Sequence, residues 1–184
     1  MAKAAIAERR EPLAGEKLAN KYVTIEAAAA ASRISLRASE AGAKSFEKGL
    51  GFKLPRKPKT SASKGGKHAL WLGPDEWIII NEDDVDTSMV PRLPNKEFVA
   101  TEISHRNAAT VISGDGAEAT LSAGCPQNLS LATFPVGACS RTVFGKAEVI
   151  LYRTGDDTFR MEFWRSYSEY VWDLLNEAAK DAHV

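Results

Sequence analysis

The chain has few of the residues that build metal or redox sites. Its 184 residues include two cysteines, Cys125 and Cys139, and three histidines, His68, His105 and His183. The cysteines have no CxxC spacing and no nearby histidine, so the pattern argues against a metal site or a redox site. A disulfide between the two cysteines is one interpretation, and we favour two free, buried thiols.

The chain also lacks long apolar runs and an excess of charge of either sign. No apolar stretch reaches the roughly 18 residues of a membrane-spanning helix. The 24 basic residues balance 24 acidic ones, so overall electrostatics favour neither nucleic acid nor a membrane surface as a partner. Residues 1–11 lack the apolar segment of a secretory signal, and we therefore expect a cytoplasmic protein.

Length and composition are typical of one soluble globular domain, or of two small halves that share a core. A chain of this size buries roughly 70% of its unfolded surface and needs no covalent staples. We expect a mobile N-terminal arm at 1–14 and a single α+β domain at 15–184. Possible halves of that domain are 15–107 and 108–184.

The N-terminal half mixes helical and strand patterns. Residues 16–31 fit either a helix or a strand, whereas Arg33–Arg37 alternate as in a strand. Ser39 is placed to cap a short helix that ends at Gly51. Two paired strands, His68–Leu72 and Trp77–Asn81, flank a Gly-Pro-Asp-Glu turn.

Residues 55–67 carry five lysines or arginines among small residues, which predicts a flexible loop. A basic clamp for a phosphate or an acidic partner is the alternative function for this loop. Further on, residues 82–90 suggest a short helix, and two more strands are expected at 97–104 and 109–113.

Two helix starts and a hairpin organise the C-terminal half. Asp115, with Glu118 three residues later, predicts a capped helix that ends at Gly124, and Ser166 with Glu169 predicts a second capping box. Between these helices, residues 141–165 indicate a hairpin of two strands, and residues 128–135 show no regular pattern. The mixture of helices and hairpin-linked strands indicates an α+β fold with antiparallel sheets.

The last strand of this hairpin has two different faces. Phe159, Met161 and Phe163 share one face and are expected in the core. The other face carries Arg160 and Trp164, a composition that protein interfaces favour, although burial of Trp164 between two layers is the alternative. We select as interface candidates Trp77, His105, Arg106, Arg141, Arg153, Trp164 and Arg165.

The glycine-rich segment Gly114–Ala119 matches the G-x-G-x-x-A pattern of dinucleotide sites. The acidic residue expected about 20 positions later is missing, so we favour a tight turn into a helix. His105 lacks an identifiable orienting partner for catalysis. Sequence patterns therefore predict no catalytic, cofactor-binding or metal-binding residue in this chain.

Several motifs stand in the order and spacing of one family. They are Leu72-Gly-Pro-Asp-Glu-Trp77, Ser104-His-Arg-Asn107, Gly124-Cys-Pro-Gln-Asn-Leu129, Phe134-Pro-Val-Gly137, Arg141-Thr-Val-Phe-Gly-Lys-Ala-Glu148 and Arg165-Ser166 followed by Tyr170-Val-Trp172. The chain resembles the gamma subunit of heterotetrameric sarcosine oxidase over roughly residues 70–180. Val111–Leu121 also resembles a strand-turn-helix segment of folate-dependent aminomethyltransferases, which implies two ferredoxin-like halves like those of their folate-binding domain.

The resemblance implies a role within a larger enzyme. Such complexes oxidise sarcosine to glycine, produce hydrogen peroxide, and release formaldehyde or pass the one-carbon unit to tetrahydrofolate. FAD, FMN and NAD are expected on the alpha and beta subunits and zinc on the delta subunit, with no cofactor on this chain. Gln127 and Asn128 stand where folate-binding relatives tend to have an aspartate, which argues against a folate site. The alternative is a stand-alone folate-binding or aminomethyltransferase-like protein.

Overall fold

The computed structural model describes residues 11–83 and 97–182. The strands are β1 (Lys17–Ala19), β2 (Thr24–Ala27), β3 (Ser32–Ala38), β4 (Ser61–Lys64), β5 (Lys67–Gly73), β6 (Glu76–Asn81), β7 (Phe98–Glu102), β8 (Asn107–Ser113), β9 (Cys139–Phe144), β10 (Ala147–Gly155) and β11 (Thr158–Trp164). The helices are α1 (Glu40–Leu50), α2 (Ala117–Ser122), the 3-10 helix η2 (Arg165–Tyr167) and α3 (Ser168–Lys180).

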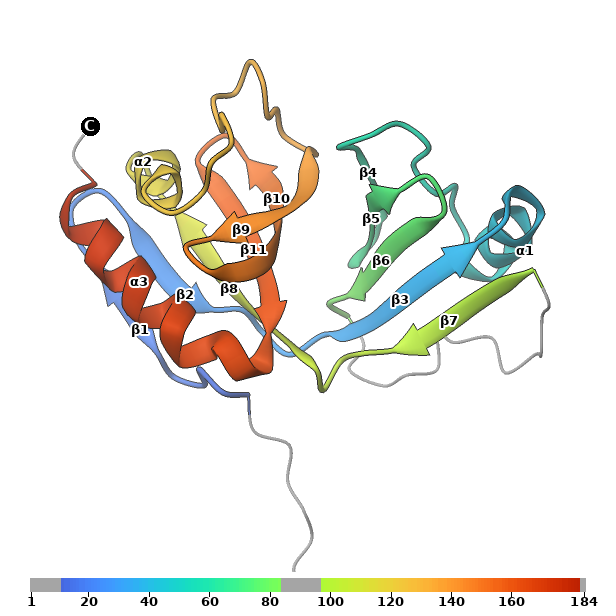
Figure 1. The fold of residues 1–184 in the computed structure, drawn as a ribbon, viewed down its shortest axis with the longest axis horizontal. Coiled ribbons are helices and arrows are strands. Elements are labelled where there is room, and N and C mark those ends of the chain that lie inside the picture. The colour runs from blue at the N-terminus through green and yellow to red at the C-terminus, as the bar shows by residue number, and fades with distance from the viewer. Residues whose placement is uncertain (1–10, 84–96, 183–184) are drawn as a thin grey trace, which may run out of the picture.

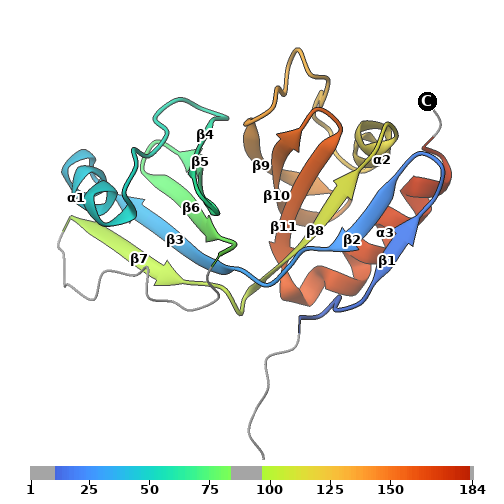
Figure 2. The same cartoon turned by 180° about the vertical axis from the view of Figure 1, so that it is seen from behind.

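Two antiparallel sheets lie side by side, and helices cover their outer sides (Figures 1 and 2). The six-stranded sheet has the order β1-β2-β8-β11-β10-β9, and the five-stranded sheet has the order β4-β5-β6-β3-β7. Helices α2 and α3 cover the first sheet and α1 covers the second. The predicted α+β fold with antiparallel sheets is confirmed.

The two sheets share one plan. Each contains a repeated unit in which a strand and a helix are followed by a three-stranded meander. The last strand of the meander pairs with the first strand of the unit. In the five-stranded sheet these elements are β3, α1 and β4 to β6, and in the six-stranded sheet they are β8, α2 and β9 to β11. Each half therefore repeats the same arrangement.

Each sheet takes up the strand that directly precedes the first strand of the other sheet's repeat. Strand β2 leads into β3 yet pairs with β8, and β7 leads into β8 yet pairs with β3. The two segments 24–38 and 98–113 thus form one antiparallel ribbon that crosses from sheet to sheet (Figure 2). A simple division at residue 107 does not describe this arrangement, because β1 and β2 belong to the sheet of the C-terminal half.

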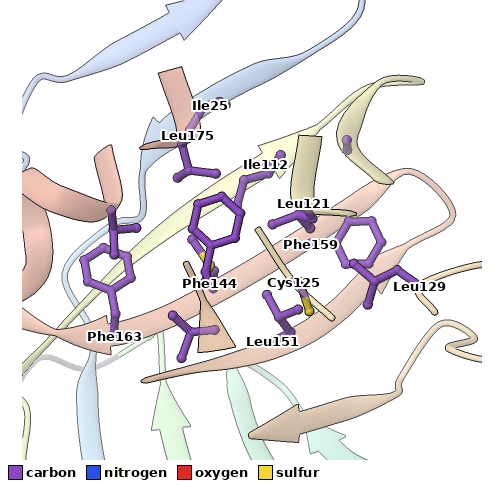
Figure 3. Packing of buried hydrophobic residues seen from close by; sticks show 14 of the residues in the cluster. Ile25, Ile112, Leu121, Cys125, Leu129, Phe144, Leu151, Phe159, Phe163 and Leu175 are labelled. Carbon is purple, nitrogen blue, oxygen red and sulfur yellow. The ribbon is translucent and has the colours of Figure 1, made fainter. Parts of the chain in front are cut away.

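Three apolar clusters hold the layers together. The largest lies between the six-stranded sheet and helices α2 and α3, where Ile112, Phe144, Phe159 and Leu175 meet (Figure 3). A second cluster packs α1 against the five-stranded sheet. A third joins the two sheets directly and consists of Ala31, Leu70, Ile78, Ile80, Ile103, Cys139 and Tyr152.

Strand β11 contributes to two of these layers, as its alternating sequence predicts. Phe159, Met161 and Phe163 are fully buried against the helices. On the opposite face, Arg160 and Glu162 are also shielded from solvent, because they are 4% and 1% exposed between the two sheets. The arginine on this face is therefore an internal group.

Glu162 is the centre of a buried ionic network. Its carboxylate accepts from Arg33 Nε at 2.5 Å and from Arg160 Nε at 2.8 Å. Arg160 also donates to Glu82 Oε1 at 2.7 Å, and His68 Nε2 lies 3.4 Å from the other oxygen of Glu82. Arg33, Glu82 and His68 belong to one half and Arg160 and Glu162 to the other, so the network links the halves.

Burial alone would raise the pKa of Glu162, but the guanidinium groups of Arg160 and Arg33 outweigh it, and the pKa is lowered. The carboxylate is therefore ionised at neutral pH. Among the thiols, burial raises the pKa of Cys139 to about 12. Both cysteines are free and buried, as expected.

The structure decides one open alternative at the N-terminal side and corrects two predictions. The segment 16–31, which fits either a helix or a strand by sequence, contains two strands and no helix. The predicted loop at 55–67 contains β4, which forms a tight hairpin with β5. Leu13 lies within the expected arm but is 5% exposed and packs into the largest core cluster. Most of the predicted helix at 82–90 lies outside the described residues.

Both predicted capping boxes are wrong. Gly116, and not Asp115, precedes α2, and it makes no side-chain cap. The last helix begins at Ser168, because residues 165–167 form a 3-10 turn first. The Ser168 hydroxyl donates to the Arg165 carbonyl at 2.7 Å instead of capping a later amide. By contrast, the Ser39 cap and the Gly51 terminus of α1 are confirmed.

Replacing Glu162 by Gln tests the ionic network. Removing the carboxylate leaves the buried Arg33 guanidinium without its counter-charge and Arg160 with Glu82 alone, so the free energy of unfolding should fall by about 3–5 kcal/mol. Urea denaturation measures this loss. Glu148→Gln is the control, since Glu148 is 56% exposed and lies 4.0 Å from Arg141, and it should cost less than about 1 kcal/mol. Equal losses for the two variants would contradict a special role for Glu162.

The lowered pKa of Glu162 also predicts a dependence of stability on pH. A carboxyl whose pKa is depressed by folding stabilises the folded state above its unfolded pKa, about 4.3 for glutamate. This contribution should disappear as the pH falls from that value through the lower folded pKa. The difference in unfolding free energy between the wild type and Glu162→Gln should therefore shrink below about pH 4.3. A constant difference down to the acid transition would contradict this assignment.

Candidate protein-interaction surface

The structure divides the seven interface candidates into two groups. Trp77 and Arg153 are buried, with exposed fractions of 2% and 1%. The other five, His105, Arg106, Arg141, Trp164 and Arg165, are exposed. We therefore withdraw the first two as surface groups and consider the other five together.

Trp77 belongs to the apolar cluster between α1 and the five-stranded sheet. Its Nε1 donates to the Pro55 carbonyl at 2.8 Å, and its ring lies 5.3 Å below the guanidinium of Arg56. These contacts tie the segment after α1 to strand β6. The Gly-Pro-Asp-Glu turn before Trp77 thus positions a packing group.

Arg153 organises the irregular segment after α2. Its guanidinium donates to the carbonyls of Leu129 at 2.5 Å, Phe134 at 3.0 Å and Asp156 at 3.1 Å. It also lies 4.6 Å from the ring centre of Phe159. A single cation therefore satisfies buried backbone carbonyls that have no secondary-structure partner.

The remaining candidates come together from distant parts of the chain. Arg106, Arg141 and Trp164 line one small cavity between the sheets. Arg165 is joined to this group by its backbone amide, which donates to the Arg106 carbonyl at 2.8 Å. We call the exposed residues His105, Arg106, Arg141, Trp164, Arg165 and Tyr167 the arginine–tryptophan surface.

Three side chains of this surface lie next to one another, with the Trp164 and Tyr167 rings tilted by 40°. The guanidinium of Arg106 lies 4.9 Å from the ring centre of Trp164, and the rings of Trp164 and Tyr167 are 6.3 Å apart. Trp164 is 41% exposed and Tyr167 is 39% exposed. Tyr167 is not among the sequence candidates; it lies in the 3-10 helix η2, which leaves its ring partly exposed.

Arg141 joins the two sheets at the surface. Its Nη2 lies 2.5 Å from Glu76 Oε1, and Arg37 donates to the other oxygen of Glu76 at 3.0 Å. The hydrogen bond with Glu76 raises the pKa of Arg141 above its ordinary value. Arg141 is thus already paired within the chain, unlike the Arg106 guanidinium, which contacts a neutral ring.

The space between the sheets leaves little room for a ligand. The cavity beside Trp164 has a volume of about 50 Å³, whereas ligand pockets usually measure about 300–1,000 Å³. An open groove of about 470 Å³ lies between residues 58–61 and 133–138, and Lys59 is its one titratable lining residue. Across residues 11–83 and 97–182, no group of three or more His, Cys, Asp or Glu side chains is arranged to hold a metal ion.

The glycine-rich segment after β8 has a structural explanation. Gly114 has φ +109°, and a Cβ there would lie 2.5 Å from the Tyr22 carbonyl oxygen. The amide of Gly116 donates to the same oxygen at 2.9 Å. The glycines therefore allow close backbone approach to the end of the β1–β2 hairpin, as expected for a tight turn into a helix.

The fold and the surface make this chain a small two-sheet α+β protein with exposed arginine and aromatic side chains and little free space between its sheets. The chain belongs to the sarcosine oxidase gamma subunit family, whose family model matches residues 36–181. In the part of the chain that the structure describes, no helix is long and apolar enough to cross a membrane.

Curated relatives agree with this assignment. The sarcosine oxidase subunit gamma of Corynebacterium sp. (strain P-1) is 26% identical over 164 residues, covering 86% of this chain and 81% of the relative. The subunit gamma of Corynebacterium sp. (strain U-96) is 26% identical over 174 residues, covering 91% and 84%.

Solved structures share the fold. A chain of heterotetrameric sarcosine oxidase from Corynebacterium sp. U-96, in complex with pyrrole 2-carboxylate, matches with a TM-score of 0.82 and 24% identity, over 96% of this chain and 97% of that one. Aminomethyltransferase T of the glycine cleavage system from Bartonella henselae matches with a TM-score of 0.61 and 14% identity, over 84% of this chain and 45% of that one.

Replacing Arg153 by Met tests its internal role. The variant leaves the buried carbonyls of Leu129 and Phe134 without their donor, so stability should fall by about 3 kcal/mol. Arg141→Met is a matched control at a 37% exposed side chain and should cost about 1 kcal/mol or less. Thermal unfolding followed by circular dichroism compares the two variants. Similar midpoints would contradict the assignment of Arg153 as the organising group of this segment.

Proposed function

We propose that this chain is a non-catalytic gamma subunit of a heterotetrameric sarcosine oxidase, with alpha, beta and delta subunits as its partners. The complex would oxidise sarcosine to glycine and reduce oxygen to hydrogen peroxide. FAD, FMN, NAD and zinc would be held by the other subunits, and the one-carbon unit would leave as formaldehyde or on tetrahydrofolate. The assembly would work in the cytoplasm.

The match of the family model to residues 36–181 carries this proposal. The geometry supports a binding role, because the inter-sheet space of the described chain is filled by ion pairs around Glu162 and leaves about 50 Å³. In contrast, Trp164 and Tyr167 are large apolar groups left partly exposed. Exposed aromatic side chains beside arginine are typical of protein interfaces.

Co-expression with the alpha, beta and delta subunits of a heterotetrameric sarcosine oxidase tests the assembly. We expect the chain to co-purify with them through size exclusion as a stable complex. Such a complex requires an interface that buries more than about 1,000 Å². The isolated chain should show no flavin absorbance and no sarcosine-dependent peroxide. Purification of the chain alone from the co-expressing cells would contradict the proposal, as would peroxide formation by the isolated chain.

A folate-binding role is the second candidate, and the similarity to aminomethyltransferase T favours it. The small cavity does not fit a folate, and Gln127 Nε2 is already engaged with the Ser140 hydroxyl at 2.5 Å. We therefore expect titration calorimetry of the isolated chain with tetrahydrofolate to show no binding up to millimolar ligand. A dissociation constant in the micromolar range would support the folate-binding alternative instead.

A further inference from the structure

Arg106 differs from the other arginines of the described chain in its partners. Six of them lie within ion-pair distance of a carboxylate, namely Arg33, Arg37, Arg56, Arg141, Arg153 and Arg160. Arg165 also has an interaction of its own. Within residues 11–83 and 97–182, the Arg106 guanidinium contacts only neutral groups, the Asn107 side-chain oxygen at 3.4 Å and the Trp164 ring.

The Arg106 guanidinium lies over an aromatic ring, although no carboxylate of residues 11–83 and 97–182 is within ion-pair distance of it. The ring of Trp164 lies under the guanidinium at 4.9 Å, and Tyr167 supports the ring from the next turn of chain. Stacking on an aromatic ring leaves the edge N–H donors of a guanidinium available, and these donors match a carboxylate in geometry. The side chain is therefore ordered before a partner arrives, which reduces the entropy lost on binding.

Three acidic side chains line the same cavity as Arg106. Glu162 is occupied by Arg33 and Arg160 inside the network, Glu76 is occupied by Arg37 and Arg141, and the half-exposed Glu148 lies 4.0 Å from Arg141. Among the described residues, none of these carboxylates lies within ion-pair distance of Arg106. The Arg106 charge therefore stands beside two aromatic rings without a direct ion pair in the described part of the chain.

We propose that Arg106, Trp164 and Tyr167 form a receptor for a carboxylate side chain of the flavoprotein subunits, with an apolar group of the same partner segment covering the two rings. This inference rests on the proposed function. The partner feature is an aspartate or glutamate next to an apolar residue, so that the ion pair forms on Arg106 while the neighbour excludes water from it. Charge complementarity thus determines where the subunits meet.

The test measures binding of the chain to the purified complex of the other subunits by biolayer interferometry. Arg106→Gln should weaken binding by at least about 30-fold, and Arg106→Glu should weaken it further because two carboxylates would then face each other. Arg106→Lys keeps the charge but loses the planar stack and should fall between wild type and Arg106→Gln. Trp164→Ala should also weaken binding by at least about 30-fold.

Lys44→Gln is the matched control, since Lys44 is a 67% exposed cation on α1, and it should bind like the wild type. Raising the salt concentration should slow association of the wild type more than that of Arg106→Gln. If Arg106→Gln and the wild type bind equally, the carboxylate receptor is excluded while the gamma-subunit role stands. If Lys44→Gln weakens binding as much as Arg106→Gln does, the carboxylate receptor is also excluded, because loss of any positive charge would then explain the result. If the wild type itself does not bind, the proposed function fails.

Discussion

The ion pair network around Glu162 is the constraint on which the two-sheet arrangement depends. A carboxylate that is 1% exposed, like that of Glu162, is tolerated when cations surround it, and here the cations come from both halves of the chain. Arg33 approaches from β3 and Arg160 from β11. Because these groups satisfy one another only when the sheets are correctly placed, the network selects one relative position of the halves, which apolar packing alone specifies less sharply.

This placement also determines the surface. Trp164 follows Glu162 by two residues and lies on the same face of β11, so the network places it at the end of the inter-sheet space. Part of its ring then remains exposed beside Arg106. The interaction surface is therefore a direct continuation of the core, and its side chains have rigid support from behind.

Local patterns in the sequence predicted much of the fold, and the failures have physical causes. The alternation of β11 and the cap of α1 depend on near neighbours and were predicted correctly. The capping boxes at Asp115 and Ser166 failed because tertiary contacts of the neighbouring turns override local propensity. For the candidate site, composition suggested Trp164 and Arg106, but it could not separate them from Arg153, because only the fold shows which arginine is surrounded by carbonyls.

The exchange of β2 and β7 between the sheets has a consequence for how the chain folds. Ile25 in β2 faces Ile112 in β8 across the register, so the six-stranded sheet stays incomplete until the polypeptide beyond α1 and the meander has left the ribosome. Pairing between such distant segments is slow, because closing a long loop costs conformational entropy before contacts between the strands offset that cost. Neither half is then an autonomous folding unit, and a nascent chain stopped after β6 would display open strand edges that chaperones recognise.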